Sequence, residues 1–386
     1  MDFGFTEEQR AAAEAARAVF SGTSPDGVPS PALSRGPAAE DFDRALWHRL
    51  ARADLLSLYA SPEHGGAGLG PLALCLVLRE AGAVLARVPL LECGAAALTL
   101  RTHGGSAAAR LLPPLGRGEL VITTAAHGRT GHEPAERAVR ALPSADGSGA
   151  WLLHGEQTAV PWGHTADRVL LPAHTDDGRA LLALVRPAPG AHPGLTLEEQ
   201  VSTNGERLAR VRLDAVRVDG QEVITAEGAW DRLRALLTVG TCALALGIGT
   251  EVCRTTSEYT GRREQFGFPI ATFQAVAVQA ADRYIDLRAM EATLWQAAWR
   301  IESGAAESDG PACPLPADAD IAVAKVWAAE GVRRIVQTAQ HLHGGYGADI
   351  SSPLHRYHAW AKQLELSLGP AAAHLEALGD LLAEQP

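Results

Sequence analysis

The residues that point most clearly to chemistry lie near the C-terminus, where two adjacent glycines interrupt helical sequence. The segment reads Ala339-Gln340-His341-Leu342-His343-Gly344-Gly345-Tyr346-Gly347. Glycine inside a helix costs roughly 1 kcal/mol relative to alanine, so an adjacent pair needs a reason. One reason is a loop and helix start that bind a phosphate, because glycine lets the backbone approach and free N–H groups attract an anion. The other is a simple turn between helices, in which His341 and His343 only cap or pack.

A second candidate group runs from Arg263 to Gln274 and combines a cation, an aromatic ring and a glycine. Arg263 carries a permanent charge, and its guanidinium suits bidentate contact with a phosphate. Phe266 presents a flat face on which a ring can stack. The simpler interpretation makes Arg263 a surface residue beside Glu264.

Composition limits the class of protein before any motif is interpreted. A chain of 386 residues suits about two or three domains. The formal net charge of −11 disfavours nucleic-acid binding, which depends on cationic neutralisation of phosphates. No apolar run reaches the roughly 18 residues of a membrane span, and no signal peptide is evident. The cysteines form no C-x-x-C pair, which predicts free thiols in a reducing cytoplasm and no metal site. They are Cys75, Cys93, Cys242, Cys253 and Cys313.

The pattern along the chain predicts three parts: residues 1–118 helical, 119–222 built of strands, and 223–386 helical again. In the first part, Thr6 followed by acids is a helix-capping signature. Further helices are expected at 46–56 and 72–85, with a loop at 23–41 and a glycine-rich turn at 61–68.

The middle part alternates short apolar runs with turns, which predicts a small β-barrel or sandwich. Asp146-Gly147 and Asp177-Gly178 are hairpin signals. The expected strands are 120–125, 150–153, 168–172, 180–185 and 209–218.

The third part contains an apolar face at helical spacing, followed by a loop at 303–317 and helices from Ala319. Glu291 falls on that face, either paired with an arginine or buried as a functional acid. The face consists of Phe273, Val276, Ala280, Tyr284, Leu287, Leu294 and Ala298.

This order of parts, with these motifs, resembles the acyl-CoA dehydrogenase flavoprotein family over nearly the whole chain. The opening Met1–Glu8 is similar to that of the family, and Pro62–Gly68 matches its P-E-x-G-G-x-G turn. Arg263–Gln274 matches R-x-x-F-G-x-P-I-x-x-F-Q, and Gly344-Gly345 matches G-G-x-G. The ending Leu354–Gly369 is most similar to an actinobacterial subgroup in which two different subunits associate and sterol side chains are frequent substrates.

The resemblance implies an α+β fold with an N-terminal helical domain, a middle β-barrel and a C-terminal four-helix bundle. It also implies an FAD cofactor between barrel and bundle, with the pyrophosphate and adenine end held by the neighbouring subunit. The implied cofactor-binding residues are Arg263, Gln265, Phe266, Gln274, His341, Gly344 and Gly345 from the bundle, and Val160, Pro161 and Trp162 from the barrel.

The catalytic base of the family is missing from both places where it is known. The family reaction removes the α-proton of an acyl thioester with a glutamate while a hydride leaves the β-carbon for the flavin. Matching the motifs puts those glutamate positions at Leu368 and Leu237, and leucine cannot accept a proton. Relocated bases would be sought at Glu251, Asp349 or Glu365, each of which otherwise is a solvated or paired carboxylate.

The middle domain departs from the family as well. The T-E-P-x-x-G-S-D stretch corresponds to 125–131 here, without its acid–proline and serine–aspartate pairs. The threonine that would hydrogen-bond the flavin is Pro161, which has no hydroxyl and no N–H. Trp162 either packs on the flavin ring or belongs to the barrel core.

These gaps predict a subunit that lends half of a flavin site to a paralogous partner carrying the base. The expected assembly is a dimer or a dimer of dimers with bundle helices at the interface, acting on an acyl-CoA or carrier-bound acyl substrate. An electron-transferring flavoprotein would be the usual electron acceptor. Two alternatives stay open: a self-sufficient flavin oxidase, monooxygenase or dehydrogenase with altered chemistry, and a non-catalytic scaffold subunit.

Overall fold

The computed structural model describes residues 4–33, 36–130, 136–303 and 316–383. Met1–Phe3, Gly131, Cys313 and most of the expected loop at 303–317 lie outside these ranges.

The N-terminal part is helical, as predicted. The Thr6 hydroxyl accepts a hydrogen bond from the Gln9 N–H, and the Gln9 side chain accepts one from the Thr6 N–H, so a capping box fixes the helix start. Short 3-10 turns occupy Pro25–Gly27, Pro31–Leu33 and Pro62–His64. The helices are α1 (Glu7–Phe20), α2 (Arg44–Arg52), α3 (Pro71–Ala83), α4 (Leu90–His103) and α5 (Ser106–Gly116).

The middle part is one eight-stranded sheet in the order β6-β7-β3-β2-β4-β5-β8, with β1 paired to β4. Every expected strand is present, and both predicted hairpin turns connect neighbouring strands, β2 to β3 and β4 to β5. The strands are β1 (Ile122–Thr124), β2 (Val139–Pro143), β3 (Trp151–Pro161), β4 (Arg168–His174), β5 (Ala180–Val185), β6 (Leu195–Val201), β7 (Arg207–Val218) and β8 (Val223–Ile224).

The sheet curls around a core of its own, in which Ala183 of β5 and Val211 of β7 belong to one buried cluster. Within the described residues the hydrogen-bonded order has two ends, β6 and β8, so the middle domain is a curled sheet there. The prediction missed β2, β6 and β8 because β2 and β8 are short and β6 is a largely polar edge strand.

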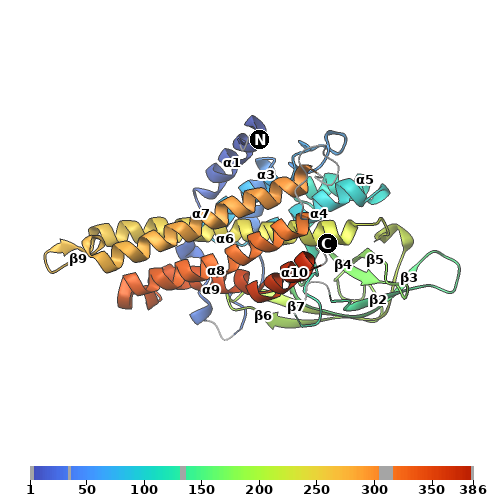
Figure 1. Cartoon of the computed structure of the whole chain (residues 1–386). Helices are drawn as coiled ribbons and strands as arrows, with labels where there is room; N and C mark the ends of the chain where they lie inside the picture. The colour runs from blue at the N-terminus through green and yellow to red at the C-terminus, as the bar shows by residue number, and fades with distance from the viewer. Residues whose placement is uncertain (1–3, 34–35, 131–135, 304–315, 384–386) are drawn as a thin grey trace.

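The C-terminal part is a bundle in which α6, α7 and α8 run side by side and project beyond the rest of the molecule (Figure 1). A hairpin of β9 (Glu264–Gln265) and β10 (Phe268–Pro269) closes the projecting end. Helix α9 returns along the bundle, and α10 packs on α8. The helices are α6 (Ala229–Arg262), α7 (Gln274–Ser303), α8 (Ala317–His343), α9 (Leu354–Leu366) and α10 (Ala371–Ala383).

Two expectations about the bundle need correction. The expected apolar face is buried only toward the end of α7, whereas Tyr284 is 62% exposed and Phe273, just before the helix, is also exposed. The second expectation was that no apolar run is as long as a membrane span. Within the described residues, helix α6 alone is long and apolar enough to cross a membrane, and 78% of its apolar window is buried inside the protein. Helix α6 is therefore the core of the bundle. The domain boundaries at 118/119 and 222/223 stay predictions, with β8 lying just past the second.

Helices α3 and α6 touch through their backbones. A Cβ on Gly82 of α3 would lie 2.2 Å from the Leu244 carbonyl oxygen, and a Cβ on Gly247 of α6 would lie 2.0 Å from that of Arg79. Only glycine permits this approach at both points. The contact fixes the N-terminal helices on the bundle and sets the spacing of the elements around the pocket described below.

Replacing Gly247 by alanine tests this contact. We expect Gly247→Ala to lower the free energy of unfolding by at least about 2 kcal/mol, since the added methyl group meets backbone that no rotamer change can move. Urea unfolding followed by circular dichroism measures the change. Gly261→Ala is the matched control on the same helix, where a Cβ meets nothing within 4 Å. It should stabilise by about 0.5–1 kcal/mol, and equal effects of the two substitutions would contradict the contact.

Candidate functional site

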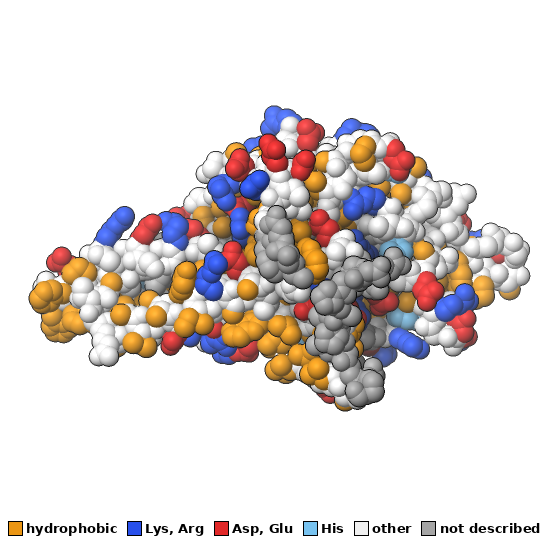
Figure 2. All heavy atoms as spheres, turned by 45° about the horizontal axis from the view of Figure 1, so that its top comes forward, with side chains coloured by type: hydrophobic (Ala, Val, Ile, Leu, Met, Phe, Trp, Pro, Cys, Tyr) orange, Lys and Arg blue, Asp and Glu red, His pale blue; other side chains and the backbone are white. Residues whose placement is uncertain are grey.

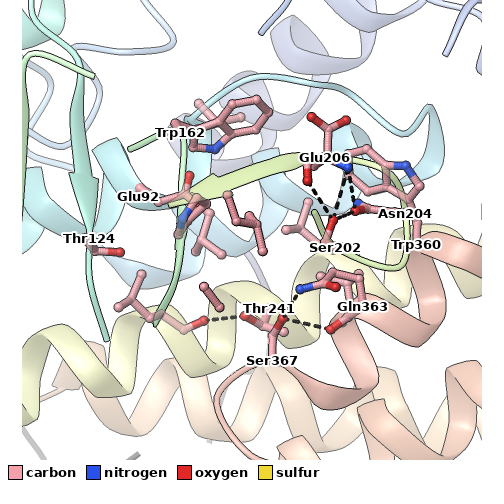
Figure 3. Close-up of a pocket in the computed structure, with 18 of the residues that line it drawn as sticks. Glu92, Thr124, Trp162, Ser202, Asn204, Glu206, Thr241, Trp360, Gln363 and Ser367 are labelled. Atoms are coloured by element: carbon pink, nitrogen blue, oxygen red, sulfur yellow. Dashed lines mark hydrogen bonds between the residues drawn. The ribbon is translucent and has the colours of Figure 1, made fainter. Parts of the chain in front are cut away.

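A cavity of about 130 Å³ lies where the N-terminal helices, the sheet and the bundle meet. Figure 3 shows Glu92 and Trp162 at one end, Asn204 and Trp360 at the other, and Thr241, Gln363 and Ser367 along the side formed by the bundle. Much of the remaining lining is aliphatic, from α3, α4 and α6. The cavity is close in size to one that holds benzene in an engineered protein, so a short hydrocarbon segment fits.

The two leucines predicted to stand at the positions of the family base both line this cavity. Leu237 comes from α6, and Leu368 follows α9 with a left-handed backbone (φ 58°). Both side chains are buried. The motif matching therefore found two residues, distant in sequence, that the fold brings to one pocket, and neither can accept a proton.

Two carboxylates line the pocket, and only one of them has a cation. Glu206, after β6, forms a buried ion pair with Arg87, in which the Arg87 Nη2 donates to Oε2 at 2.8 Å. Glu92 has no ion-pair partner among the described residues and is 8% exposed. The Trp162 indole lies close enough to the Glu92 carboxylate to favour its ionised form.

Burial in this apolar setting raises the pKa of Glu92 to about 7. The nearby Trp162 indole and the backbone N–H of Glu92, which is the third residue of α4, favour the ionised form and oppose the effect of burial. Sequence reasoning missed this residue. One feature of the sequence could have indicated it: Glu92 is the only charged residue from Val88 to Leu100.

The barrel residues expected to face the flavin have side chains that point in two different directions. Pro161 and Trp162 line the pocket, and the Pro161 carbonyl oxygen accepts a hydrogen bond from the Thr123 hydroxyl. The expectation that Val160 faces the cofactor needs correction. Side chains alternate along a strand, and the Val160 side chain points into the core of the sheet. Trp162 has a left-handed backbone (φ 56°) and packs edge-on against Phe42, so it belongs to the pocket wall.

Two further polar side chains line the pocket, and each has a buried ring nitrogen without a hydrogen-bond partner among the described residues. The indole Nε1 of Trp360, on α9, is buried and makes no hydrogen bond there. His127 lies in the segment that replaces the T-E-P-x-x-G-S-D stretch, and its Nδ1 is also unpaired. Burial lowers the pKa of His127 to about 4, so this imidazole is neutral at pH 7.

The bundle residues expected to bind FAD gather at the projecting tip instead. Phe266 is 90% exposed, and it and Gly267 have φ values of 53° and 82°, which form the two-residue turn of the β9–β10 hairpin. The Arg263 side chain is exposed and makes no ion pair or hydrogen bond within the described part of the chain. Gln265 and Gln274 are exposed beside them.

The double glycine lies at the same end. Helix α8 stops at His343, whose ring stacks on Tyr259 of α6 at 4.2 Å, so His343 packs as in the simpler interpretation. Gly344 has a φ of 61°, and a Cβ on Gly345 would meet nothing within 4 Å. His341 is exposed nearby. A 3-10 turn over Gly344–Ala348 follows, so packing within this chain does not account for the open space over the glycines.

The candidate residues thus form a pocket group and a tip group, joined by α6. At a rise of about 1.5 Å per residue, Arg262 lies about 38 Å from Leu237 along that helix. The exposed cation, ring and glycines of the tip suit one end of a dinucleotide. The pocket is smaller than the roughly 300–1,000 Å³ of most ligand sites, and Pro161 offers no N–H donor, so the pocket half fits a flavin less well.

The carboxylates first considered as relocated bases lie outside the pocket. Glu251 pairs with Arg254 and Glu365 with Lys362, each at 2.6 Å. Asp349 accepts a hydrogen bond from the Ser351 N–H at 2.8 Å. Glu291 pairs with Arg288, so the paired interpretation of that residue is confirmed. The described residues contain no cluster of three or more side chains that could hold a metal ion.

Comparison with known proteins gives concordant results. Residues 6–119 match the N-terminal domain and residues 207–382 the C-terminal domain of acyl-CoA dehydrogenases. The acyl-CoA dehydrogenase FadE27 of Mycobacterium tuberculosis is 36% identical over 354 residues, covering 89% of this chain and 90% of the relative.

Two solved structures have similar chains. A chain of the ChsE4–ChsE5 complex from M. tuberculosis superposes with a TM-score of 0.86, at 34% identity over 100% of both chains. A variant of the Tcur3481–Tcur3483 steroid ACAD gives 0.86, at 35% identity over 98% of both. The expected fold and the resemblance to two-subunit enzymes are confirmed. This chain belongs to the acyl-CoA dehydrogenase family, whose members are FAD-dependent oxidoreductases that act on CH–CH bonds.

Proposed function

We propose that this chain is one subunit of a heteromeric acyl-CoA dehydrogenase. In this assignment its bundle tip completes the FAD site of a partner chain, and the partner carries the glutamate that removes the α-proton of an acyl thioester. Bound FAD would accept the hydride that leaves the β-carbon. The observation that carries the proposal is the separation of the tip group from a pocket in which both usual base positions are leucine.

The separation supports sharing between chains. The tip and the pocket of one chain are joined by a continuous helix that holds them about 38 Å apart. A single cofactor can therefore contact both a pocket and a tip only when the pocket belongs to one chain and the tip to another. Arg263 would hold the pyrophosphate through paired N–H donors, and Phe266 would stack on a ring of the cofactor.

The surface around the tip has the composition of an interface. Figure 2 shows apolar side chains gathered at the projecting end of the bundle, and Phe266, Phe268, Phe273, Tyr284 and Ile285 are exposed there. Exposed aromatic residues beside arginine are typical of the buried centre of a protein–protein contact. The exposed half of α7 is thus accounted for by a neighbouring chain, in a dimer or a dimer of dimers.

The relatives favour a second, different chain over a second copy. The similar solved structures are named as two-component assemblies, and one of them as a steroid ACAD. By analogy the substrate is an acyl thioester, with a bulky sterol-like chain, a polyketide intermediate or a short branched acyl group as candidates, carried by CoA or a carrier protein. An electron-transferring flavoprotein is the expected acceptor, and the cytoplasm the expected location.

The absorption spectrum of the purified protein tests the assignment. We expect flavin bands only when the chain is co-expressed with a paralogue that carries the glutamate, because the tip of this chain and the pocket of the partner form one site. Size-exclusion chromatography with absorbance detection measures both assembly and flavin content. A stable, flavin-loaded monomer of this chain would refute the proposal.

Replacing Arg263 tests the role of the tip within the complex. We expect Arg263→Ala to weaken FAD retention by about 10- to 100-fold, which corresponds to loss of a charged hydrogen bond of about 1.5–3 kcal/mol. Equilibrium dialysis of the reconstituted complex gives the affinity. The adjacent Arg262→Ala, also exposed and outside the motif, is the control and should change little. Equal losses in both variants would mean that general charge, rather than the Arg263 site, holds the cofactor.

A further inference from the structure

The pocket of this chain contains an acid that the proposed function does not use. Both usual base positions, Leu237 and Leu368, line the same cavity as Glu92. A carboxylate buried without a cation is costly, and such groups concentrate where a protein handles protons. Glu92 therefore needs an explanation that packing alone does not provide.

The other acid of the pocket is already committed. Glu206 accepts hydrogen bonds from two nitrogens of Arg87, which also donates to the Asp41 carbonyl oxygen at 3.0 Å. This ion pair links the turn after α3 to the loop after β6. Glu92 is thus the one pocket carboxylate, within the described residues, whose oxygens are not held by a cation.

We propose that Glu92 is the acid–base group of the pocket in this chain, acting from α4 in place of the two missing glutamates. This inference rests on the acyl chemistry of the family and not on the heteromer. In the step, the Glu92 carboxylate forms an O–H bond with the α-proton of an acyl thioester as the C–H bond breaks. The electron pair passes into the thioester carbonyl, and return of a proton to the α-carbon restores both partners without an oxidant.

The surroundings of Glu92 suit this role. The Trp162 indole lies beside its carboxylate and favours the ionised form, and both residues line the same cavity. Nearby titratable groups keep one charge state around pH 7: Cys93 stays protonated because burial raises its pKa, and His127 stays neutral because burial lowers its pKa to about 4. Glu206 stays paired with Arg87. A pKa of about 7 lets Glu92 both accept and return a proton near neutral pH.

Exchange of the α-protons of butanoyl-CoA in D2O, followed by mass spectrometry, tests the proposal with the full chain alone. We expect exchange above a protein-free blank that rises with pH through about 7 and falls about 100-fold in Glu92→Gln, the usual size of a general-base effect. Glu291→Gln, a glutamate outside the pocket, is the control and should leave the rate unchanged. The measurement needs neither partner nor flavin, so its outcome is independent of the heteromer test. Exchange no faster than the blank, or equal in Glu92→Gln, would overturn the proposal.

The pH profile separates an acid–base role from a structural one. Trp162→Phe removes the indole N–H that favours the ionised carboxylate, so the midpoint of the exchange profile should move to higher pH while exchange persists. A residue that only shaped the pocket would change the rate without moving the midpoint. An unshifted midpoint in Trp162→Phe would therefore count against proton transfer at Glu92.

Thermal unfolding gives a second readout that does not depend on catalysis. Because the pKa of Glu92 is raised in the folded state, its contribution to stability is complete below about pH 4.5 and is lost as pH rises through about 7. We expect Glu92→Gln to raise the melting temperature at pH 8 relative to the parent and to change it less at pH 5. A variant effect that does not depend on pH would show that Glu92 does not titrate in this range and would overturn the proposal.

Discussion

The backbone contact between α3 and α6 is the constraint on which the rest of the structure depends. Helices usually pack with axes about 8–10 Å apart, separated by side chains. Here Gly82 and Gly247 remove that layer on both sides, so each backbone meets the carbonyl groups of the other. Helix α4 follows α3 and brings Glu92 beside the part of α6 that carries Leu237. The dimensions of the pocket therefore follow from two residues that do not line it.

Helix α6 connects this pocket to the bundle tip and keeps the two apart. Its first half is buried and forms the core of the bundle, while its last turns lead to the exposed hairpin with Phe266 at its tip. A continuous helix cannot bend its two ends onto one ligand. The same helix thus provides the floor of one site and the support for half of another, which is the geometric basis for sharing a cofactor between chains.

Much of the architecture could be predicted from the sequence, because periodicity and turn chemistry report local structure. The capping box at Thr6, the hairpins at Asp146-Gly147 and Asp177-Gly178, and the family motifs all proved informative. What the sequence did not reveal depends on neighbours. Strand β6 is polar and is held by pairing with β7, and the direction of Val160 depends on strand alternation. Glu92 carries no motif, and its burial in the pocket gives weight to its isolation in an otherwise uncharged segment.

Phe266 and Glu92 each break a local rule, one at the bundle tip and one in the pocket that α6 connects to it. Phe266 exposes an aromatic ring from a left-handed backbone, which folding of one chain does not reward. Glu92 buries an acid whose replacement by an apolar side chain would relieve its desolvation. At Leu237 and Leu368 the pocket has apolar residues where the family has acids, so the pocket accommodates aliphatic side chains without difficulty. A pocket reduced to packing would favour an aliphatic residue at the position of Glu92 too, and the acid there is therefore best explained by proton chemistry.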